Sequence, residues 1–204
     1  MTFKEALTIP GAWFEQAKRN IYMRKSFRNM PVAKELKAIS SINDIPVLLS
    51  FGTNYRPDPT RGFLRDKTIH PRAIQHKIDT GEYGKTLFDC DDHAAYWCAQ
   101  LLKNKQFINK VYFAEIRFPK DKDGKNSGHA FCIFEGLDSK LYWADYNYPA
   151  LFSDDNKKIF DCMDEVCKAY GYDKNSKGMF IFEVEHSDKE TDSIKLHSPK
   201  AKLW

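Results

Sequence analysis

The sequence predicts an α+β domain in which helices pack against an antiparallel sheet. Helical patterns dominate the first half, whereas three consecutive segments after residue 110 are rich in the aromatic and β-branched residues typical of strands. The chain has 204 residues, of which 42% are hydrophobic and 14% aromatic, enough for one buried core of ordinary domain size. We therefore expect a single domain over residues 1–186 and a loose polar tail at 187–204.

The N-terminal part, residues 1–45, is expected to be a helical extension of a core at 46–186. Apolar residues recur at helical spacing over 10–39, with a break at Pro31 and a second short helix after it. Residues 1–40 carry eight Lys or Arg against three Asp or Glu, in a chain whose net charge is only +4. We interpret this basic run as a solvated helix face, so nucleic acid is not an expected partner.

The elements of the core each carry their own pattern. Proline and glycine residues at 52–65 exclude regular structure, and an irregular loop of this length often carries function. Gly81 ends the predicted helix at 68–80, at the C-terminal position where helices favour glycine. The predicted elements are a buried strand at 47–51, helices at 68–80, 91–102 and 157–170, and strands at 111–118, 128–135, 140–147 and 179–185.

Composition also indicates where the protein works. No apolar run is long enough to span a membrane, and the first residues lack the basic and apolar regions of a secretion signal. The five cysteines are an odd number and are scattered along the chain, which argues against a disulfide framework. We therefore expect a cytoplasmic protein with no membrane partner.

Cys90 stands where the helix at 91–102 begins, and this position suits a nucleophile. Unpaired backbone N–H groups at a helix N-terminus lower the pKa of a thiol. Asp89 is expected to cap the helix, and Asp91 and Asp92 suit its dipole, but these acids oppose a negative sulfur. A reactive cysteine here therefore requires a nearby base.

His129 is the strongest candidate for that base, because it begins an aromatic-rich strand directly after a glycine. If the hairpin turns through 136–138, strand pairing sets His129 directly opposite Asp145, with Cβ atoms about 5 Å apart. A carboxylate at that distance can hold the imidazole in one tautomer and stabilise its charged form. Cys90, His129 and Asp145 thus form a predicted catalytic triad.

Three short segments surround these residues. They read Phe-Asp-Cys-Asp-Asp-His-Ala at 88–94, Gly-His-Ala at 128–130 and Tyr-Trp-Ala-Asp at 142–145. Together they resemble the transglutaminase-like cysteine peptidases, a branch of the papain-like fold, in their compact bacterial and bacteriophage versions. The resemblance covers roughly residues 50–150.

The resemblance implies a papain-like core and assigns roles to the triad. Cys90 would be the nucleophile, His129 the general base and then the general acid, and Asp145 the residue that orients His129. It implies acyl transfer on a protein or peptide amide, with hydrolysis by a peptidase or deamidase the simplest outcome. The setting would be the cytoplasm of a bacterium or of a phage-infected host cell.

The tetrahedral oxyanion of such a reaction needs two donors. The backbone N–H of Cys90 is one by position. Related enzymes draw the second from a side chain upstream, and Asn54, Tyr55 and Gln75 are the candidates here. Some bacterial relatives also bind calcium beside the cysteine, which would nominate Asp89 and Asp91, although capping is the preferred role of these residues; no other cofactor is expected.

Two other interpretations remain open. Cys90, His93, His129 and Asp145 have ligand types that suit zinc, although a single Cys-x-x-His is a weak signal. The domain could also be a catalytically inactive binding or structural module, for example a component of a phage particle, because a set of triad residues does not show that the cleft is open. We expect no catalytic role for His93.

Overall fold

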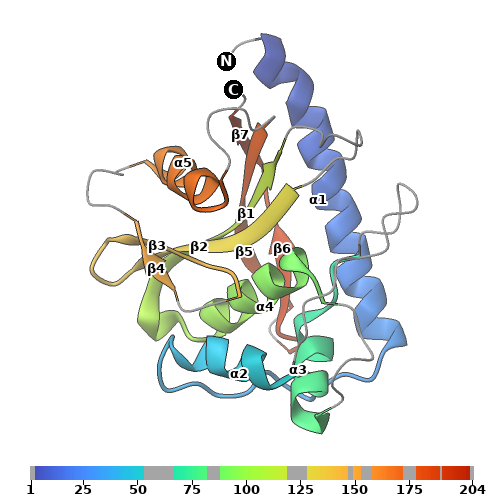
Figure 1. Ribbon diagram of the computed structural model, residues 1–204. Helices are drawn as coiled ribbons and strands as arrows, with labels where there is room; N and C mark the ends of the chain where they lie inside the picture. Colours follow the sequence, from blue (N-terminus) through green and yellow to red (C-terminus); the bar gives the residue numbers. More distant parts are fainter. Residues whose placement is uncertain are drawn as a thin grey trace.

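The computed structural model shows helices packed on an antiparallel sheet, which confirms the predicted α+β class (Figure 1). The structure describes residues 3–52, 67–81, 88–118, 128–146, 149–152, 158–171, 178–188 and 190–202. Across these residues, no helix combines the length and the hydropathy that a membrane span requires.

Within the described residues, seven strands form the sheet, in the order β4-β3-β2-β1-β5-β6, with β7 paired to β5. Every pairing is antiparallel. The strands are β1 (Ile108–Arg117), β2 (Gly128–Gly136), β3 (Leu141–Ala144), β4 (Ala150–Leu151), β5 (Gly178–Asp188), β6 (Ser193–Leu196) and β7 (Lys200–Lys202).

Alternate residues of the strands face two separate apolar clusters, because successive side chains of a strand point to opposite faces. Phe113, Cys132 and Phe134 belong to the cluster that includes the helix α4 (Cys90–Lys103). Their strand neighbours, such as Phe131 and Ile133, belong to a second cluster with the helix α5 (Ile159–Ala169). The sheet is therefore covered by α4 on one face and by α5 on the other.

The helix α4 is buried along nearly its whole length, from Asp91 to Leu102. We expected one buried face, but the sheet lies on one side of the helix and further helices lie on the other (Figure 1). These are α2 (Asp44–Gly52) and α3 (Pro71–Thr80), whereas α1 (Phe3–Asn29) lies against β6, β7 and α3. A short 3₁₀ helix, η1 (Lys105–Phe107), leads from α4 into β1.

The helices α3 and α4 begin and end as their sequences predict. Gly81 has a positive φ of 62° and caps the C-terminus of α3, a conformation that glycine adopts without strain. Asp89 is the N-cap residue of α4, and its backbone N–H donates to the Asp92 carboxylate at 3.3 Å. Capping thus explains the acidic residues on both sides of Cys90.

Two predicted elements near the N-terminus are wrong. The run at 47–51 lies in the helix α2, because a short apolar run does not distinguish a buried strand from a buried helix. The helix expected after Pro31 does not form. Its amides donate elsewhere: Ala33 to the Arg72 carbonyl, Leu36 to the Asp192 carboxylate and Lys37 to the Gln75 side chain.

The C-terminal tail is also different from the prediction. The strand β5 continues to Asp188, and β6 and β7 follow it in the same sheet. Ile194 and Leu196 alternate with more exposed residues along β6 and are buried in the α4 cluster. Residues 187–188 and 190–202 are therefore part of the domain rather than a loose extension of it.

Candidate active site

His129 and Asp145 lie in contact at the end of the sheet where β2 begins and β3 ends. The Nε2 atom of His129 is 3.3 Å from Oδ2 of Asp145, and both side chains are buried. The ring nitrogen Nδ1 makes no hydrogen bond to any described residue. This arrangement leaves Nδ1 available to exchange a proton, while Nε2 is held by the carboxylate.

The strand pairing behind this contact differs from the predicted one. Glu135 pairs with Leu141, because the three-residue loop is 137–139 and Gly136 hydrogen-bonds to Lys140. Continued along the strands, this pairing sets Asp145 diagonal to His129 rather than directly opposite it. The displacement is two residues, so both side chains stay on the same face, and a diagonal neighbour is within reach of a long side chain.

The position of Asp145 is fixed by both helical layers. The indole Nε1 of Trp97, on α4, donates to the Asp145 backbone carbonyl at 2.7 Å. The hydroxyl of Tyr170, at the end of α5, donates to Oδ2 of Asp145, and the backbone N–H of Tyr146 donates to Oδ1 at 2.5 Å. Burial would raise the pKa of Asp145, but the hydrogen bonds from His129 and Tyr170 lower it overall, so the carboxylate is the charged form.

Cys90 is half-buried at the first turn of α4 and packs against the α4 cluster. The backbone N–H of Ala130, the residue after His129, interacts with its thiol and favours the thiolate. Burial raises the pKa of the thiol nonetheless, and the carboxylates of Asp91 and Asp89 raise it further. The resting thiol is therefore neutral, in contrast to the low pKa that its position at the helix terminus suggests.

The Cys90 thiol interacts with the backbone of the residue that follows His129 on β2, and not with the imidazole itself. Among the described residues, no hydrogen bond joins the Cys90 sulfur to either ring nitrogen of His129. The structure thus brings His129 to Asp145 and Cys90 to Ala130. Catalytic hydrogen bonds often tighten only when substrate is bound.

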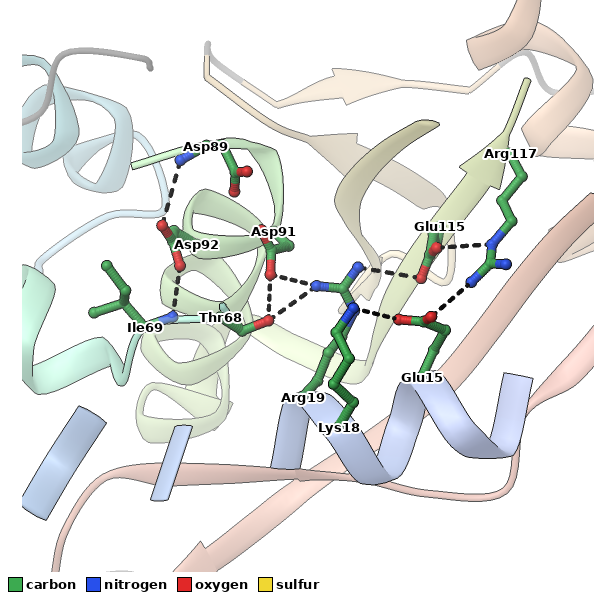
Figure 2. A network of polar contacts seen from close by, with 10 residues as sticks. All are labelled: Glu15, Lys18, Arg19, Thr68, Ile69, Asp89, Asp91, Asp92, Glu115 and Arg117. Carbon is green, nitrogen blue, oxygen red and sulfur yellow. Dashed lines mark hydrogen bonds and ion pairs between the residues drawn. The ribbon is translucent and has the colours of Figure 1, made fainter. Parts of the chain in front are cut away.

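A buried network of charges supports the start of α4 (Figure 2). Arg19, on α1, donates to the carboxylate of Asp91 and to the hydroxyl of Thr68. It also lies 3.3 Å from Glu115 on β1, which is paired with Arg117. The basic run that we expected to be solvated thus contributes a cation that is only 4% exposed.

Asp91 and Asp92, which follow Cys90, have pKa values shifted in opposite directions. Burial would raise the pKa of Asp91, but the charge of Arg19 and hydrogen bonds such as that from Thr68 lower it overall. The pKa of Asp92 is raised well above its ordinary value by burial and by the charges of Asp91 and Asp89. Asp91 is therefore the charged partner of Arg19, and the neutral form of Asp92 is favoured.

The carboxylates of Asp89, Asp91 and Asp92 have ligand atoms within 4.8 Å of one another. Calcium requires six to eight oxygen ligands that are free to coordinate it. Here the guanidinium of Arg19 already neutralises Asp91, and Asp92 accepts the backbone N–H of Ile69 at 2.6 Å. The contacts therefore do not fit the calcium site expected at Asp89 and Asp91.

The ligand atoms proposed for zinc do not gather in this conformation. Within the described part of the chain, the only group of three or more such atoms at that spacing is the aspartate cluster. Cys90, His93, His129 and Asp145 would have to rearrange before they could share one metal ion.

His93 lies beside the candidate site and is buried there. Its ring is 4% exposed and packs edge-on against Tyr146, with 4.9 Å between the ring centroids. Burial lowers the pKa of His93 to about 4, although the carboxylates of Asp145 and Asp91 oppose this shift. Neither ring nitrogen has a hydrogen-bond partner among the described residues, so His93 is a neutral imidazole beside the pair.

The candidates for the second oxyanion donor have different outcomes. Asn54 and Tyr55 lie outside the described residues. Gln75 is buried on α3, where its carbonyl oxygen accepts from Tyr96 and from the backbone of Lys37, and its amide donates to Asp79 at 2.8 Å. These contacts use Gln75 in packing α3 against α4, away from the first turn that bears Cys90.

A groove of about 480 Å³ lies elsewhere on the molecule. It is lined by Phe107, Phe134, Leu137 and Tyr142, among other residues. These surround the hairpin at the far end of β2 from His129. The groove is therefore separate from the candidate active site.

Comparison with protein-family models, with curated proteins and with solved structures finds no match for this chain. The function of the protein is therefore inferred from its residues and from their geometry.

Proposed function

We propose that this protein is a cysteine-dependent hydrolase of amide bonds in proteins or peptides, related to the transglutaminase-like branch of the papain-like fold. The observation that carries the proposal is the contact of His129 with a charged Asp145 beside Ala130, whose backbone faces the Cys90 sulfur. We assign the nucleophile to Cys90 on α4, the base to His129 on β2 and the orienting carboxylate to Asp145 directly after β3.

In the proposed reaction, Nδ1 of His129 accepts the proton of the Cys90 thiol. The sulfur attacks the carbonyl carbon of the substrate amide, and the resulting oxyanion accepts the backbone N–H of Cys90, which has no acceptor inside the helix. His129 then returns the proton to the departing amine as the C–N bond breaks. Water, deprotonated by His129, attacks the thioester, releasing the carboxylic acid and restoring the thiol.

The neutral state of the resting thiol determines what His129 must do. Because burial and two carboxylates disfavour an isolated thiolate, the sulfur can ionise only together with protonation of the imidazole. Asp145 stabilises that imidazolium. Reactivity of Cys90 should therefore depend on His129 more strongly than in a cysteine whose thiolate forms alone.

The first test is the rate at which iodoacetamide alkylates Cys90 at neutral pH, followed by mass spectrometry. Cys98, Cys132, Cys162 and Cys167 are buried, so selectivity over them would reflect access alone. The informative comparison is between variants: His129→Gln should slow alkylation about tenfold or more. His76→Gln, on α3 away from the site, should leave the rate unchanged, and equal rates in all three proteins would contradict the proposal.

The second test identifies the reaction. A bacterial lysate treated with the wild-type protein or with Cys90→Ala is analysed for new N-termini, deamidated glutamines and isopeptide links. New N-termini or deamidated side chains that depend on Cys90 support hydrolysis. Isopeptide links alone would show that an amine, rather than water, resolves the thioester.

An inactive binding or structural module is the second candidate function. It is favoured by the raised pKa of the Cys90 thiol and by its lack of a hydrogen bond to His129 among the described residues. Alkylation that is slow and insensitive to His129→Gln, with no product in the lysate, would support this candidate.

A further inference from the structure

Tyr170 reaches the candidate site from the face of the sheet opposite to α4. Its hydroxyl donates to Oδ2 of Asp145, the same oxygen that contacts Nε2 of His129. Its ring lies against the imidazole, with 4.4 Å between the centroids and 46° between the planes. One side chain therefore touches both members of the pair.

The helix α5 fixes the position of Tyr170. Tyr170 is the C-cap residue, and its backbone N–H hydrogen-bonds to the carbonyls of Val166 and Cys167 at 3.1 and 3.2 Å. Val166 and Cys167 are themselves buried in the α5 cluster, together with Phe131 of β2. The hydroxyl is thus held by packing against the same strand that carries His129.

We propose that Tyr170 is a positioning residue of the active site: its hydroxyl fixes the carboxylate of Asp145 and its ring limits rotation of the His129 imidazole. This inference rests on the proposed function. With Tyr146 donating to Oδ1 and Tyr170 to Oδ2, the carboxylate cannot rotate without losing a hydrogen bond. The imidazole is then held with Nε2 on the acid and Nδ1 free for the thiol.

Among the described residues, titratable side chains that interact with Asp145 come from three elements. They are His129 on β2, Tyr170 at the end of α5 and His93 on α4. His93 is a neutral imidazole at neutral pH, so His129 and Tyr170 provide the groups that stabilise the carboxylate. Removal of the Tyr170 hydroxyl should therefore raise the pKa of Asp145 toward its ordinary value.

The test is Tyr170→Phe, which removes the hydroxyl and keeps the ring. Tyr142→Phe is the matched control, because Tyr142 donates to Asp138 at 2.8 Å in the same way on the exposed hairpin. Both variants and the wild type are compared by carboxyl ¹³C NMR titration of Asp145 and by the alkylation rate of Cys90. We expect Tyr170→Phe to raise the Asp145 midpoint by about half a unit to one unit and to slow alkylation about threefold or more, with no change in Tyr142→Phe.

The outcomes separate this inference from the function on which it rests. An Asp145 midpoint and alkylation rate unchanged in Tyr170→Phe, while His129→Gln still slows alkylation, would overturn the positioning role alone. A loss of stability without a shift of the Asp145 midpoint would do the same, because it would show a packing role only. Alkylation unaffected by His129→Gln would overturn the proposed function, and the positioning role with it.

Discussion

Arg19 and Asp91 form a buried ion pair that joins two helices across 72 positions of the sequence. Asp91 directly follows Cys90 in the sequence. Arg19 also contacts Glu115 and the face of the Phe113 ring. Because an unpaired charge is costly in a protein interior, burial of the Asp91 carboxylate depends on the Arg19 guanidinium, whereas Glu115 is also paired with Arg117.

Substitution of Arg19 should therefore be strongly destabilising. We expect Arg19→Met to lower the free energy of unfolding by about 3–5 kcal/mol, because it leaves Asp91 buried without a cation and Glu115 paired with Arg117 alone. Arg24→Met, on the exposed side of the same helix, should change it by less than about 0.5 kcal/mol. Urea denaturation measures both, and equal effects would show that the buried pair contributes no more than a surface charge.

The neighbouring aspartates offer an isosteric comparison. Asp91→Asn removes the charged partner of Arg19, so a loss of about 3 kcal/mol or more is expected. Asp92→Asn removes a carboxyl whose neutral form is favoured, so its main cost is the loss of an acceptor for one backbone N–H, about 1–2 kcal/mol at neutral pH. Thermal or urea unfolding at pH 7 would contradict this assignment if the two variants were equally unstable.

Asp145→Asn should impair the site while leaving the fold in place. The amide nitrogen of asparagine would face either His129 and Tyr170 or the Tyr146 N–H, all of which are donors. By analogy with other triads, a loss of turnover on the order of a hundredfold or more is expected. The assay follows Cys90-dependent products or the alkylation rate, with Asp138→Asn on the hairpin as the control; a fully active Asp145→Asn would refute the orienting role.

His93 makes the stability of the protein dependent on pH. Its pKa in the folded state, about 4, lies below the ordinary value of 6.5, so the unfolded chain takes up the proton first as the pH falls. His93 therefore does not reduce the free energy of unfolding above pH 6.5, but it reduces this free energy progressively as the pH falls from 6.5 toward 4. Relative to the wild type, His93→Leu should gain roughly 3 kcal/mol of stability over that window.

Urea unfolding at several values between pH 7 and pH 4.5 measures this difference. His76→Leu, on α3, provides the comparison for loss of an imidazole that does not adjoin the site. A constant difference between His93→Leu and the wild type at every pH would show that His93 is not buried as a neutral ring.

Local patterns were sufficient for the elements whose periodicity is unambiguous. The helices α3, α4 and α5 and the strands β1, β2 and β5 follow from apolar spacing and from flanking glycine or proline. The contact between His129 and Asp145 was predicted from alternation together with a hairpin turn at 136–138, and the turn lies one residue later. The contact survives the wrong strand pairing because a displacement by two residues leaves both side chains on the same face.

The remaining features depend on contacts between distant segments. The helix α2 and the strand β6 have short apolar patterns that suit more than one structure, and tertiary packing decides between them. Tyr170 and Trp97 support Asp145 from separate helices, which no spacing in the sequence indicates. For Arg19, one signal was present: three carboxyls within four residues of Cys90 require a nearby cation if they are buried.

The ion pair between Arg19 and Asp91 changes where a minimal version of this protein could begin. The first 45 residues had the pattern of an appendage to the core, yet they carry the only guanidinium that contacts Asp91 among the described residues. A shortened chain starting at residue 46 would keep Cys90, His129 and Asp145 but would leave Asp91 in its interior without its counter-ion and Glu115 with Arg117 alone. Deletion studies and domain swaps should accordingly treat α1 as an integral part of the folded domain.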